Sequence, residues 1–84
     1  MTRLLYFAWV RERVGVAEEA IDLPRALATV DELLDWLATR SPGHAAALAD
    51  RGAVRVGVDQ EFARGDATIA GAREIAIFPP VTGG

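Results

Sequence analysis

The last seven residues, Phe78-Pro79-Pro80-Val81-Thr82-Gly83-Gly84, contain the residue types that point most directly to chemistry. The two prolines have a fixed φ and favour an extended path away from a preceding strand. The two glycines have no Cβ and can enter a narrow slot that any side chain would block. A carboxylate delivered into such a slot becomes reactive when a nucleoside triphosphate converts it to an acyl-adenylate, which a sulfur donor or an amine can attack. We therefore predict a carrier protein whose reactive group is the carboxylate of Gly84.

A frayed terminus is the alternative interpretation of the same residues. Glycine-rich chain ends are often disordered without having a function, and Gly83-Gly84 alone favours this alternative. Two stiff prolines placed directly after a strand-like run favour a functional tail over residues 79–84. On these residues alone, both interpretations stay open.

Length and composition indicate a single small domain over residues 1–84. A chain of 84 residues, 51% of them hydrophobic, builds one thin core. It contains no cysteine, which excludes disulfides, thiolate metal ligands and a thiol nucleophile. The net charge of −3 argues against a nucleic-acid partner, which requires a clustered basic face. No apolar run approaches the roughly 20 residues of a membrane span, and no signal peptide is recognisable, so we expect a cytoplasmic protein.

The N-terminal half predicts two strands and a helix. Residues 4–10 are apolar at odd and even positions, which is typical of a strand covered on both faces. Residues 17–23 alternate weakly and predict a second, antiparallel strand after a turn at Gly15. Thr29 and Glu32 match a capping box at the start of a helix. Its apolar face comprises Val30, Leu33, Leu34 and Leu37, residues 41–43 are expected to end it, and residues 44–50 predict a short second helix.

The C-terminal half predicts further strands. Valines alternate with other residues over 54–58 and predict a half-buried strand, and residues 61–63 predict a short return strand. The last strand covers residues 75–78 and ends at prolines that cannot continue a central strand. We therefore expect an α+β fold: a mixed sheet with one main helix packed on one face and an extended C-terminal tail.

Three segments resemble the small subunit of molybdopterin synthase, a ubiquitin-like sulfur carrier of the β-grasp fold. They are Tyr6-Phe7-Ala8-x-Val10-Arg11-Glu12 with Gly15 soon after, the turn Val58-Asp59-Gln60, and the complete C-terminal run. Trp9, at the position marked x, departs from the family, which more usually has a polar residue there. The C-terminal run is the specific part, while the resemblance extends over essentially the whole chain.

The resemblance implies a sulfur-transfer cycle. An adenylating enzyme related to the ubiquitin-activating enzymes would use Mg-ATP to adenylate Gly84, and a sulfurtransferase would convert the adenylate to a thiocarboxylate. The large subunit of the synthase would receive the tail and use its own catalytic residues to transfer two sulfurs in turn to cyclic pyranopterin monophosphate, forming the dithiolene of molybdopterin. The complex would be a heterotetramer, and this chain itself would bind no cofactor and no metal. The inserted residues would be Pro80, Val81, Thr82 and Gly83.

The sheet face without the helix is the predicted docking face for the large subunit. If the isoleucines of the last strand point inward, Phe78 points outward, and exposed aromatics clustered on one face mark an interface. We predict that Phe7, Phe62 and Phe78 contact the partner and that Arg11 pairs with a carboxylate at the rim. The alternative is that these aromatics belong to the core. In the first strand, alternation directs Leu4, Tyr6 and Ala8 inward and Leu5, Phe7 and Trp9 outward.

Several polar and aromatic residues are assigned structural roles instead. His44 has no visible partners for a metal site or a catalytic base, so we expect an exposed loop residue. Trp36 is expected to cover the short second helix. The acidic pairs Glu18-Glu19 and Asp31-Glu32 are interpreted as a solvated loop and a helix start, not as acid–base pairs.

Other functions are compatible with the same tail. They are a sulfur carrier for thiamine or cysteine synthesis, a ubiquitin-like protein modifier, and an interaction domain with an inert tail. The Phe-Pro-Pro-Val-Thr run favours the pterin branch. Since all nine basic residues are arginine, an amide formed by this tail must be to another chain or to its own N-terminal amine.

Overall fold

The computed structural model describes residues 1–80, and they form one mixed sheet with helices. The strands are β1 (Thr2–Tyr6), β2 (Glu18–Ile21), β3 (Arg55–Val58), β4 (Glu61–Ala63) and β5 (Glu74–Phe78). The helices are α1 (Ala8–Val14), α2 (Val30–Leu37), α3 (Pro42–Ala47) and the 3-10 turn η1 (Arg51–Ala53).

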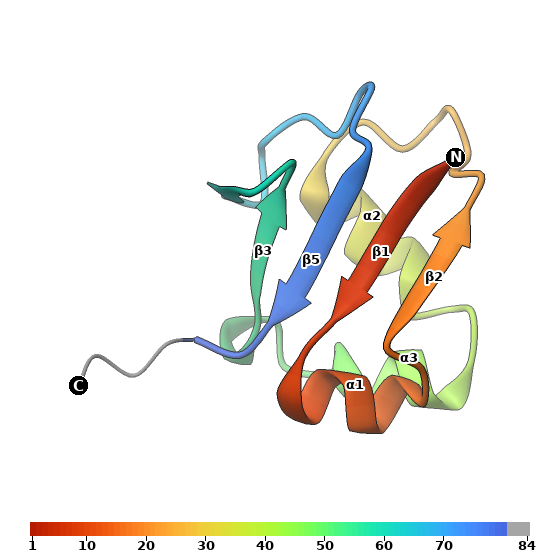
Figure 1. The fold of residues 1–84 in the computed structure, drawn as a ribbon, viewed down its shortest axis with the longest axis vertical. Coiled ribbons are helices and arrows are strands. Elements are labelled where there is room, and N and C mark those ends of the chain that lie inside the picture. Colours follow the sequence, from red (N-terminus) through yellow and green to blue (C-terminus); the bar gives the residue numbers. More distant parts are fainter. Residues whose placement is uncertain (81–84) are drawn as a thin grey trace.

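The five strands lie in the order β2-β1-β5-β3-β4, with α2 across one face (Figure 1). Strands β1 and β5 are parallel, and every other neighbouring pair is antiparallel. Because β1 and β5 are parallel, their C-terminal ends lie at the same end of the sheet, and α1 lies at that end (Figure 1). This confirms the predicted α+β fold with a mixed sheet and one main helix, the ubiquitin-like β-grasp arrangement.

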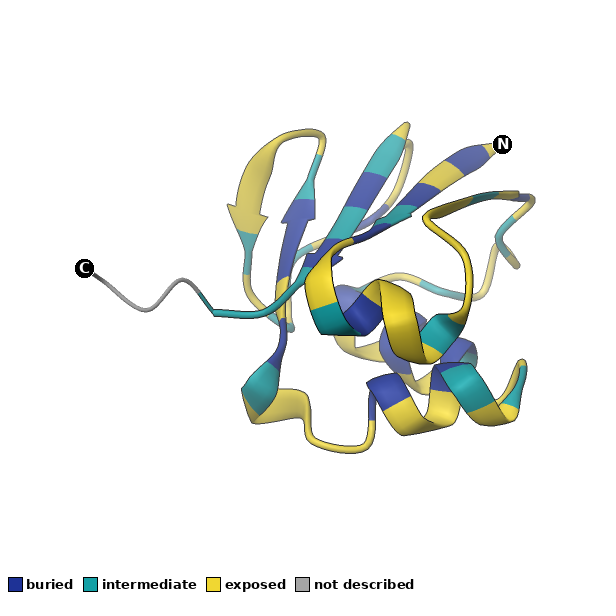
Figure 2. Cartoon of the chain, turned by 60° about the horizontal axis from the view of Figure 1, so that its bottom comes forward, coloured by how far each residue is buried: buried dark blue, intermediate teal, exposed yellow. Residues whose placement is uncertain are grey.

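The core lies between the sheet and α2. Leu4, Ile75 and Ile77 are fully buried on the sheet, and alternation along each strand accounts for this. Figure 2 shows buried residues alternating with more exposed ones along the strands. The predicted apolar face of α2 is buried as well. The capping box is confirmed: the Thr29 hydroxyl accepts from the Glu32 amide at 3.3 Å, and the Glu32 carboxylate accepts from the Thr29 amide at 3.1 Å. The start of α2 is therefore determined locally.

The predicted strand over residues 4–10 is wrong in its second half. Strand β1 ends at Tyr6, and α1 begins at Ala8, which has a left-handed φ of 53° and is exposed instead of pointing inward. Val10 is fully buried on the inner side of α1, and Gly15 ends the helix at φ 101°. A short apolar run does not distinguish a buried strand from the buried side of a helix, which explains the error.

Helix α3 starts where the sequence predicted only a helix end. Ser41 caps it by accepting from the His44 amide at 3.1 Å, and Pro42 occupies its first turn. Gly43 packs directly against the end of α1, and an added Cβ would overlap the carbonyl oxygen of Arg13. Residues 41–43, predicted only to end the preceding helix, therefore cap and begin α3.

Candidate functional site

The chain leaves the sheet from the end of β5, beside α1 (Figure 1). Phe78 is the last strand residue, and Pro79 and Pro80 follow it as half-buried residues. The predicted reactive residue Gly84 and the predicted tail residues 81–83 lie outside the described residues. The structure thus places the point from which the tail departs, and Pro80 is the one predicted tail residue that it describes.

The predicted aromatic residues lie on the face of the sheet opposite α2, which we call the open face. Phe62 is 81% exposed and Phe7 is 47% exposed, while Phe78 is half-buried. The rings of Phe62 and Phe78 are 5.9 Å apart with their planes at 56°. These three residues, from the N-cap of α1, from β4 and from β5, line one hollow of about 190 Å³. The remaining lining residues are Leu5, Gly57, Gln60, Glu61, Glu74 and Ala76.

Arg11 and Trp9 lie on α1 and not on the strand face. Arg11 is exposed, it does not line the hollow, and its contact with a partner stays a prediction. The predicted outward position of Trp9 on a strand is wrong because the chain is helical there. Its ring is half-buried against the core, and the Arg13 guanidinium lies 4.4 Å from the ring centroid. Trp36 is likewise half-buried against the core, with the Arg40 guanidinium 4.9 Å from its ring centroid.

His44 is a buried residue, so its predicted exposure is wrong. Its Nε2 lies 2.8 Å from Oε2 of Glu19, and its Nδ1 lies 2.7 Å from the Ser41 hydroxyl. The Tyr6 hydroxyl donates to the same Glu19 oxygen at 2.7 Å. Glu19 is therefore a half-buried acceptor and not part of a solvated loop, whereas Glu18 is exposed and pairs with Arg3. Sequence offered no signal for this network because its members come from β1, β2 and α3.

The network shifts the acid–base behaviour of two side chains. Burial raises the pKa of the Tyr6 hydroxyl, and its hydrogen bond to Glu19 raises that pKa further. Partial burial also favours a higher pKa for Glu19. The hydrogen bonds from Tyr6 and His44 outweigh it and lower the pKa of Glu19 below its ordinary value. Glu19 is therefore held as a carboxylate.

The geometry of the network indicates a structural role. The Ser41 oxygen accepts from the His44 amide and also contacts Nδ1, while Nε2 contacts the Glu19 carboxylate, so both ring nitrogens of His44 have a partner. Within residues 1–80, no buried side-chain nitrogen or oxygen lacks a partner, and no cluster of three metal-ligating side chains occurs. Nothing in this network is free to act as a nucleophile.

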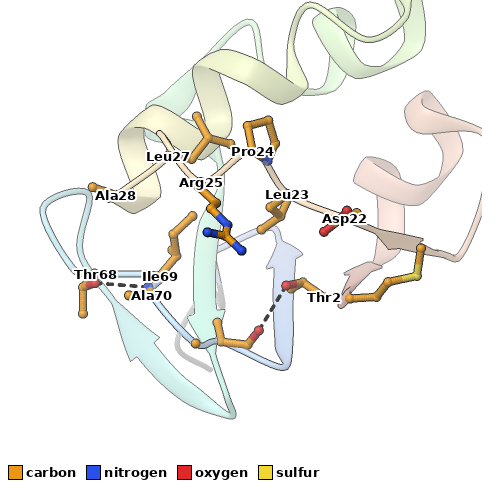
Figure 3. Close-up of a pocket in the computed structure, with 13 residues that line it drawn as sticks. Thr2, Asp22, Leu23, Pro24, Arg25, Leu27, Ala28, Thr68, Ile69 and Ala70 are labelled. Carbon is orange, nitrogen blue, oxygen red and sulfur yellow. Dashed lines mark hydrogen bonds between the residues drawn. The ribbon is translucent and has the colours of Figure 1, made fainter.

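A second hollow, of about 410 Å³, lies at the opposite end of the sheet (Figure 3). It is bounded by the start of β1, by residues 22–28 and by residues 68–72. The Thr2 hydroxyl donates to the Ala72 carbonyl at 3.1 Å, and Arg25 points into the hollow. Since β1 and β5 are parallel, this hollow is a full strand length away from the end of β5, and it takes no part in positioning the tail.

Fold and site together define a ubiquitin-like β-grasp protein whose C-terminal segment leaves the sheet beside an exposed aromatic face. The model of the ThiS family matches residues 4–84, and the chain belongs to this family. Among the helices within residues 1–80, none has the length and apolar character needed to cross a membrane.

Two relatives align along their whole length. The chain is 41% identical to the molybdopterin synthase sulfur carrier subunit of Escherichia coli K12 and 37% identical to that of Haemophilus influenzae, with 100% of both chains covered in each case. The expected resemblance is thereby confirmed.

Solved structures agree with the fold. The small archaeal modifier protein 1 of Haloferax volcanii superposes with a TM-score of 0.67 at 32% identity, covering 95% of this chain and 97% of that one. A Pyrococcus furiosus protein assigned as molybdopterin converting factor, subunit 1, superposes with a TM-score of 0.73 at 26% identity over the same shares.

Proposed function

We propose that this chain is the sulfur carrier subunit of molybdopterin synthase and that its C-terminal glycine carries the sulfur. The observation that supports this most strongly is the 41% identity to the E. coli carrier subunit over the full length of both chains. The exit of the chain beside an exposed aromatic face agrees with a tail that enters a partner while the sheet docks on it.

The proposed chemistry takes place at one carbon atom. A carboxylate oxygen of Gly84 attacks the α-phosphorus of Mg-ATP on an adenylating enzyme, and pyrophosphate leaves. A sulfurtransferase then supplies sulfur at the oxidation level of hydrosulfide, which attacks the carbonyl carbon and expels AMP. The product is a thiocarboxylate. Its sulfur is ionised near neutral pH and, like a thiolate, attacks without a strong base.

Transfer of that sulfur takes place on the large subunit. Insertion of residues 80–84 would place the thiocarboxylate beside cyclic pyranopterin monophosphate and exclude water from it. Two charged carriers in turn would supply the two sulfurs of the dithiolene, and each would return as a carboxylate. We place the reaction in the cytoplasm because the adenylation consumes ATP. This chain needs no cofactor of its own, and the catalytic residues belong to the large subunit.

Docking on the large subunit uses the open face in this proposal. Phe7, Phe62 and Phe78 supply the apolar contacts and Arg11 supplies a charged contact at the rim. Aromatic anchors at the centre of an interface usually contribute most of its binding free energy. The tail and the face thus act together, one delivering the sulfur and the other fixing its position.

The position of the terminal carboxylate provides the test. Deleting Gly84, or appending one alanine after it, should abolish restoration of molybdoenzyme activity in a strain that lacks the carrier. The circular dichroism spectrum and the thermal midpoint should stay unchanged because residues 81–84 follow the last strand. Full activity of the appended variant, with its extra residue shown intact by mass spectrometry, would overturn the proposal.

A protein modifier is the second candidate, favoured by the likeness to the small archaeal modifier protein 1. A sulfur carrier for thiamine or cysteine synthesis would use the same terminal chemistry. Intact-mass analysis of the chain from its own cells distinguishes these classes. A terminal oxygen replaced by sulfur indicates a carrier, whereas chain-linked adducts indicate a modifier. Co-purification with either the large synthase subunit or enzymes of another pathway then separates the carriers.

A further inference from the structure

We propose that the second hollow, at the end of the sheet where β5 begins, binds the C-terminal carboxylate of a second copy of this chain. Arg25 receives the carboxylate, and residues 80–84 of the second copy are the occupant. The contact shares with the proposed function only the free carboxylate of Gly84. It goes beyond that function because it holds a carrier that has not yet been adenylated away from the adenylating enzyme.

The second hollow combines apolar walls with one basic side chain. Leu23, Leu27 and Ile69 line it together with Arg25, and the lining also includes Met1, which bears the amino terminus. Its volume of about 410 Å³ lies within the roughly 300–1,000 Å³ typical of sites for small ligands. Such sites bind through apolar walls and are oriented by a few polar groups. The fitting ligand is therefore a small anion with an apolar group close to its charge.

Arg25 is placed to bind that anion. Figure 3 shows its guanidinium directed into the hollow, between Leu23 and Ile69. Among residues 1–80, this guanidinium has no ion-pair partner, since the three ion pairs there join other residues. A guanidinium binds a carboxylate through two parallel hydrogen bonds, so it recognises the planar end of a chain.

The acidic groups around the hollow leave Arg25 free for an anion. Asp22 is the one acidic lining residue, and Figure 3 shows it away from Arg25, on the side where β1 begins. Glu32 does not line the hollow, and its carboxylate accepts from the amides of Ala28 and Thr29. The side-chain charges that line the hollow therefore sum to zero in a chain whose net charge is −3. This favours an anion here over the average of the surface.

The occupant comes from a second copy because the chain's own terminus is out of reach. The hollow is lined by Ala72, just before β5, whereas the chain leaves the sheet after Phe78. Residues 72–78 span about 20 Å at about 3.3 Å per residue. The four residues beyond Pro80 extend at most about 14 Å. A tail and a hollow at opposite ends of the sheet therefore meet only between two chains, head to tail.

A head-to-tail contact leaves one free tail and one free hollow in every assembly, so its growth is open and depends on concentration. A tail of five residues buries little surface, and its ordering costs conformational freedom. We therefore expect a dissociation constant of about 0.1–1 mM. A bound tail is not available for adenylation, and dilution or competition by the adenylating enzyme releases it.

A peptide of residues 80–84, Pro-Val-Thr-Gly-Gly with a free carboxylate, tests the hollow directly. Titrated into the ¹⁵N-labelled full chain, it should shift the amide signals of residues 22–28 and 68–72 with a dissociation constant of about 0.1–1 mM. The same peptide with a C-terminal amide should bind at least about tenfold more weakly, because the charge-assisted hydrogen bonds are lost.

Arg25→Gln should weaken binding of the free-carboxylate peptide by the same factor of about ten or more. Its urea midpoint should stay unchanged, because Arg25 is exposed. The matched control is Arg64→Gln, which removes the same charge from another exposed arginine that does not line the hollow. It should change the dissociation constant less than about twofold.

Two variants that each keep one half of the contact test the assembly. A chain without residues 81–84 keeps the hollow, whereas Arg25→Gln keeps the tail. The diffusion coefficient of the unmodified chain should fall as its concentration rises from about 0.05 to about 1 mM. Each variant alone should stay monomeric over this range, and an equimolar mixture of the two should form a one-to-one pair.

Several results would overturn this inference. They are peptide-induced shifts confined to the open face around Phe62 and Phe78, equal binding of the amidated peptide, and no shift at about 5 mM peptide. Self-association that persists without residues 81–84 also overturns it, because two folded faces then form the contact. These experiments use neither the adenylating enzyme nor the large subunit, so their failure leaves the proposed function standing. Full activity of the variant with an appended alanine would overturn the proposed function and leave binding of the peptide unaffected.

Discussion

The carboxylate of Glu19 is the point at which three elements of the fold are joined. Tyr6 reaches it from β1 and His44 reaches it from α3, both through the same oxygen atom. A hydrogen bond to a charged acceptor contributes about 1.5–3 kcal/mol, more than one between neutral groups. The rings of Tyr6 and His44 also meet edge to face at 6.0 Å. One partly buried anion thereby fixes α3 against the first hairpin.

Glu19→Gln should remove an acid-sensitive part of the stability. The folded pKa of Glu19 is lowered, so its contribution is complete above the ordinary pKa of a glutamate and is lost as the pH falls through the folded pKa. At neutral pH the variant should lose about 1–3 kcal/mol of unfolding free energy in urea titrations. Between about pH 5 and about pH 3, the difference from the unmodified chain should narrow.

Glu18→Gln is the matched control for this experiment. Glu18 is the exposed neighbour in the same strand, and its pair with Arg3 at 3.2 Å is more than half exposed at both side chains. The unfolding free energy of Glu18→Gln should change with pH in the same way as that of the unmodified chain, because exposed ion pairs contribute little to stability. A gap between Glu19→Gln and the unmodified chain that stays constant over this pH range would contradict the assigned role of Glu19.

At the scale of elements, α1 and α3 form a small helical layer that shapes the end of the sheet from which the chain leaves. The Phe7 amide donates to the Ile77 carbonyl at 3.1 Å, which ties the start of α1 to β5. Gly43 lets α3 approach the last turn of α1 more closely than any side chain would permit. The hydrogen bond to β5 therefore fixes the start of α1 at Phe7, and the close approach at Gly43 fixes its other end against α3.

Gly43→Ala should destabilise the protein by about 1–3 kcal/mol in urea unfolding, because the new Cβ overlaps the Arg13 carbonyl oxygen and separates the helices. Destabilisation would be the opposite of the effect of helix propensity, since alanine alone favours a helix by about 1 kcal/mol over glycine. A loss of stability would therefore be due to the overlap.

Gly52→Ala provides the comparison for this variant. A Cβ at position 52 would approach only the Asp50 carboxylate, at 3.4 Å. Its unfolding free energy should change by less than about 0.5 kcal/mol. A Gly43→Ala protein as stable as Gly52→Ala would show that the contact between α1 and α3 has no energetic role.

At the scale of the whole molecule, the parallel pairing of β1 with β5 places the start of β1 and the end of β5 at opposite ends of the sheet. Met1 lies at the end where β5 begins, whereas Pro79 follows β5 at the end where α1 lies (Figure 1). The sequence has no lysine and therefore no side-chain amine. In the proposed function, an activated C-terminal residue would find no side-chain acceptor on its own chain, which favours reaction with a partner.

Phe62→Ala should separate binding from stability. Because Phe62 is 81% exposed on the edge strand β4, its truncation should change the unfolding free energy by less than about 0.5 kcal/mol. Affinity for the purified large subunit should fall about tenfold or more in titration calorimetry, as expected for an aromatic anchor.

The control is Val16→Ala, another exposed apolar residue, which lies in the loop between α1 and β2 and does not line the hollow. It should leave both quantities unchanged. A large loss of stability in Phe62→Ala would identify the ring as part of the core. Unchanged affinity would exclude the open face around β4 as the docking surface.

Local patterns in the sequence predicted much of this molecule because they have local physical causes. The capping box of Thr29 and Glu32, the apolar face of α2 and the alternation of Ile75 and Ile77 each depend on residues a few positions apart. The prolines and glycines of residues 79–84 predicted a reactive C-terminal tail from backbone geometry and missing side chains, and this stays a prediction.

Only the tertiary structure decided the outcomes that depend on residues distant along the chain. The helix at Ala8, the burial of His44 against Glu19 and the hollow above Gly57 and Ala76 were not predictable, because each depends on which element packs beside it. Periodicity states which side chains share a face. Whether that face is covered, and what a buried polar group meets there, is determined by packing between segments that the sequence does not place side by side.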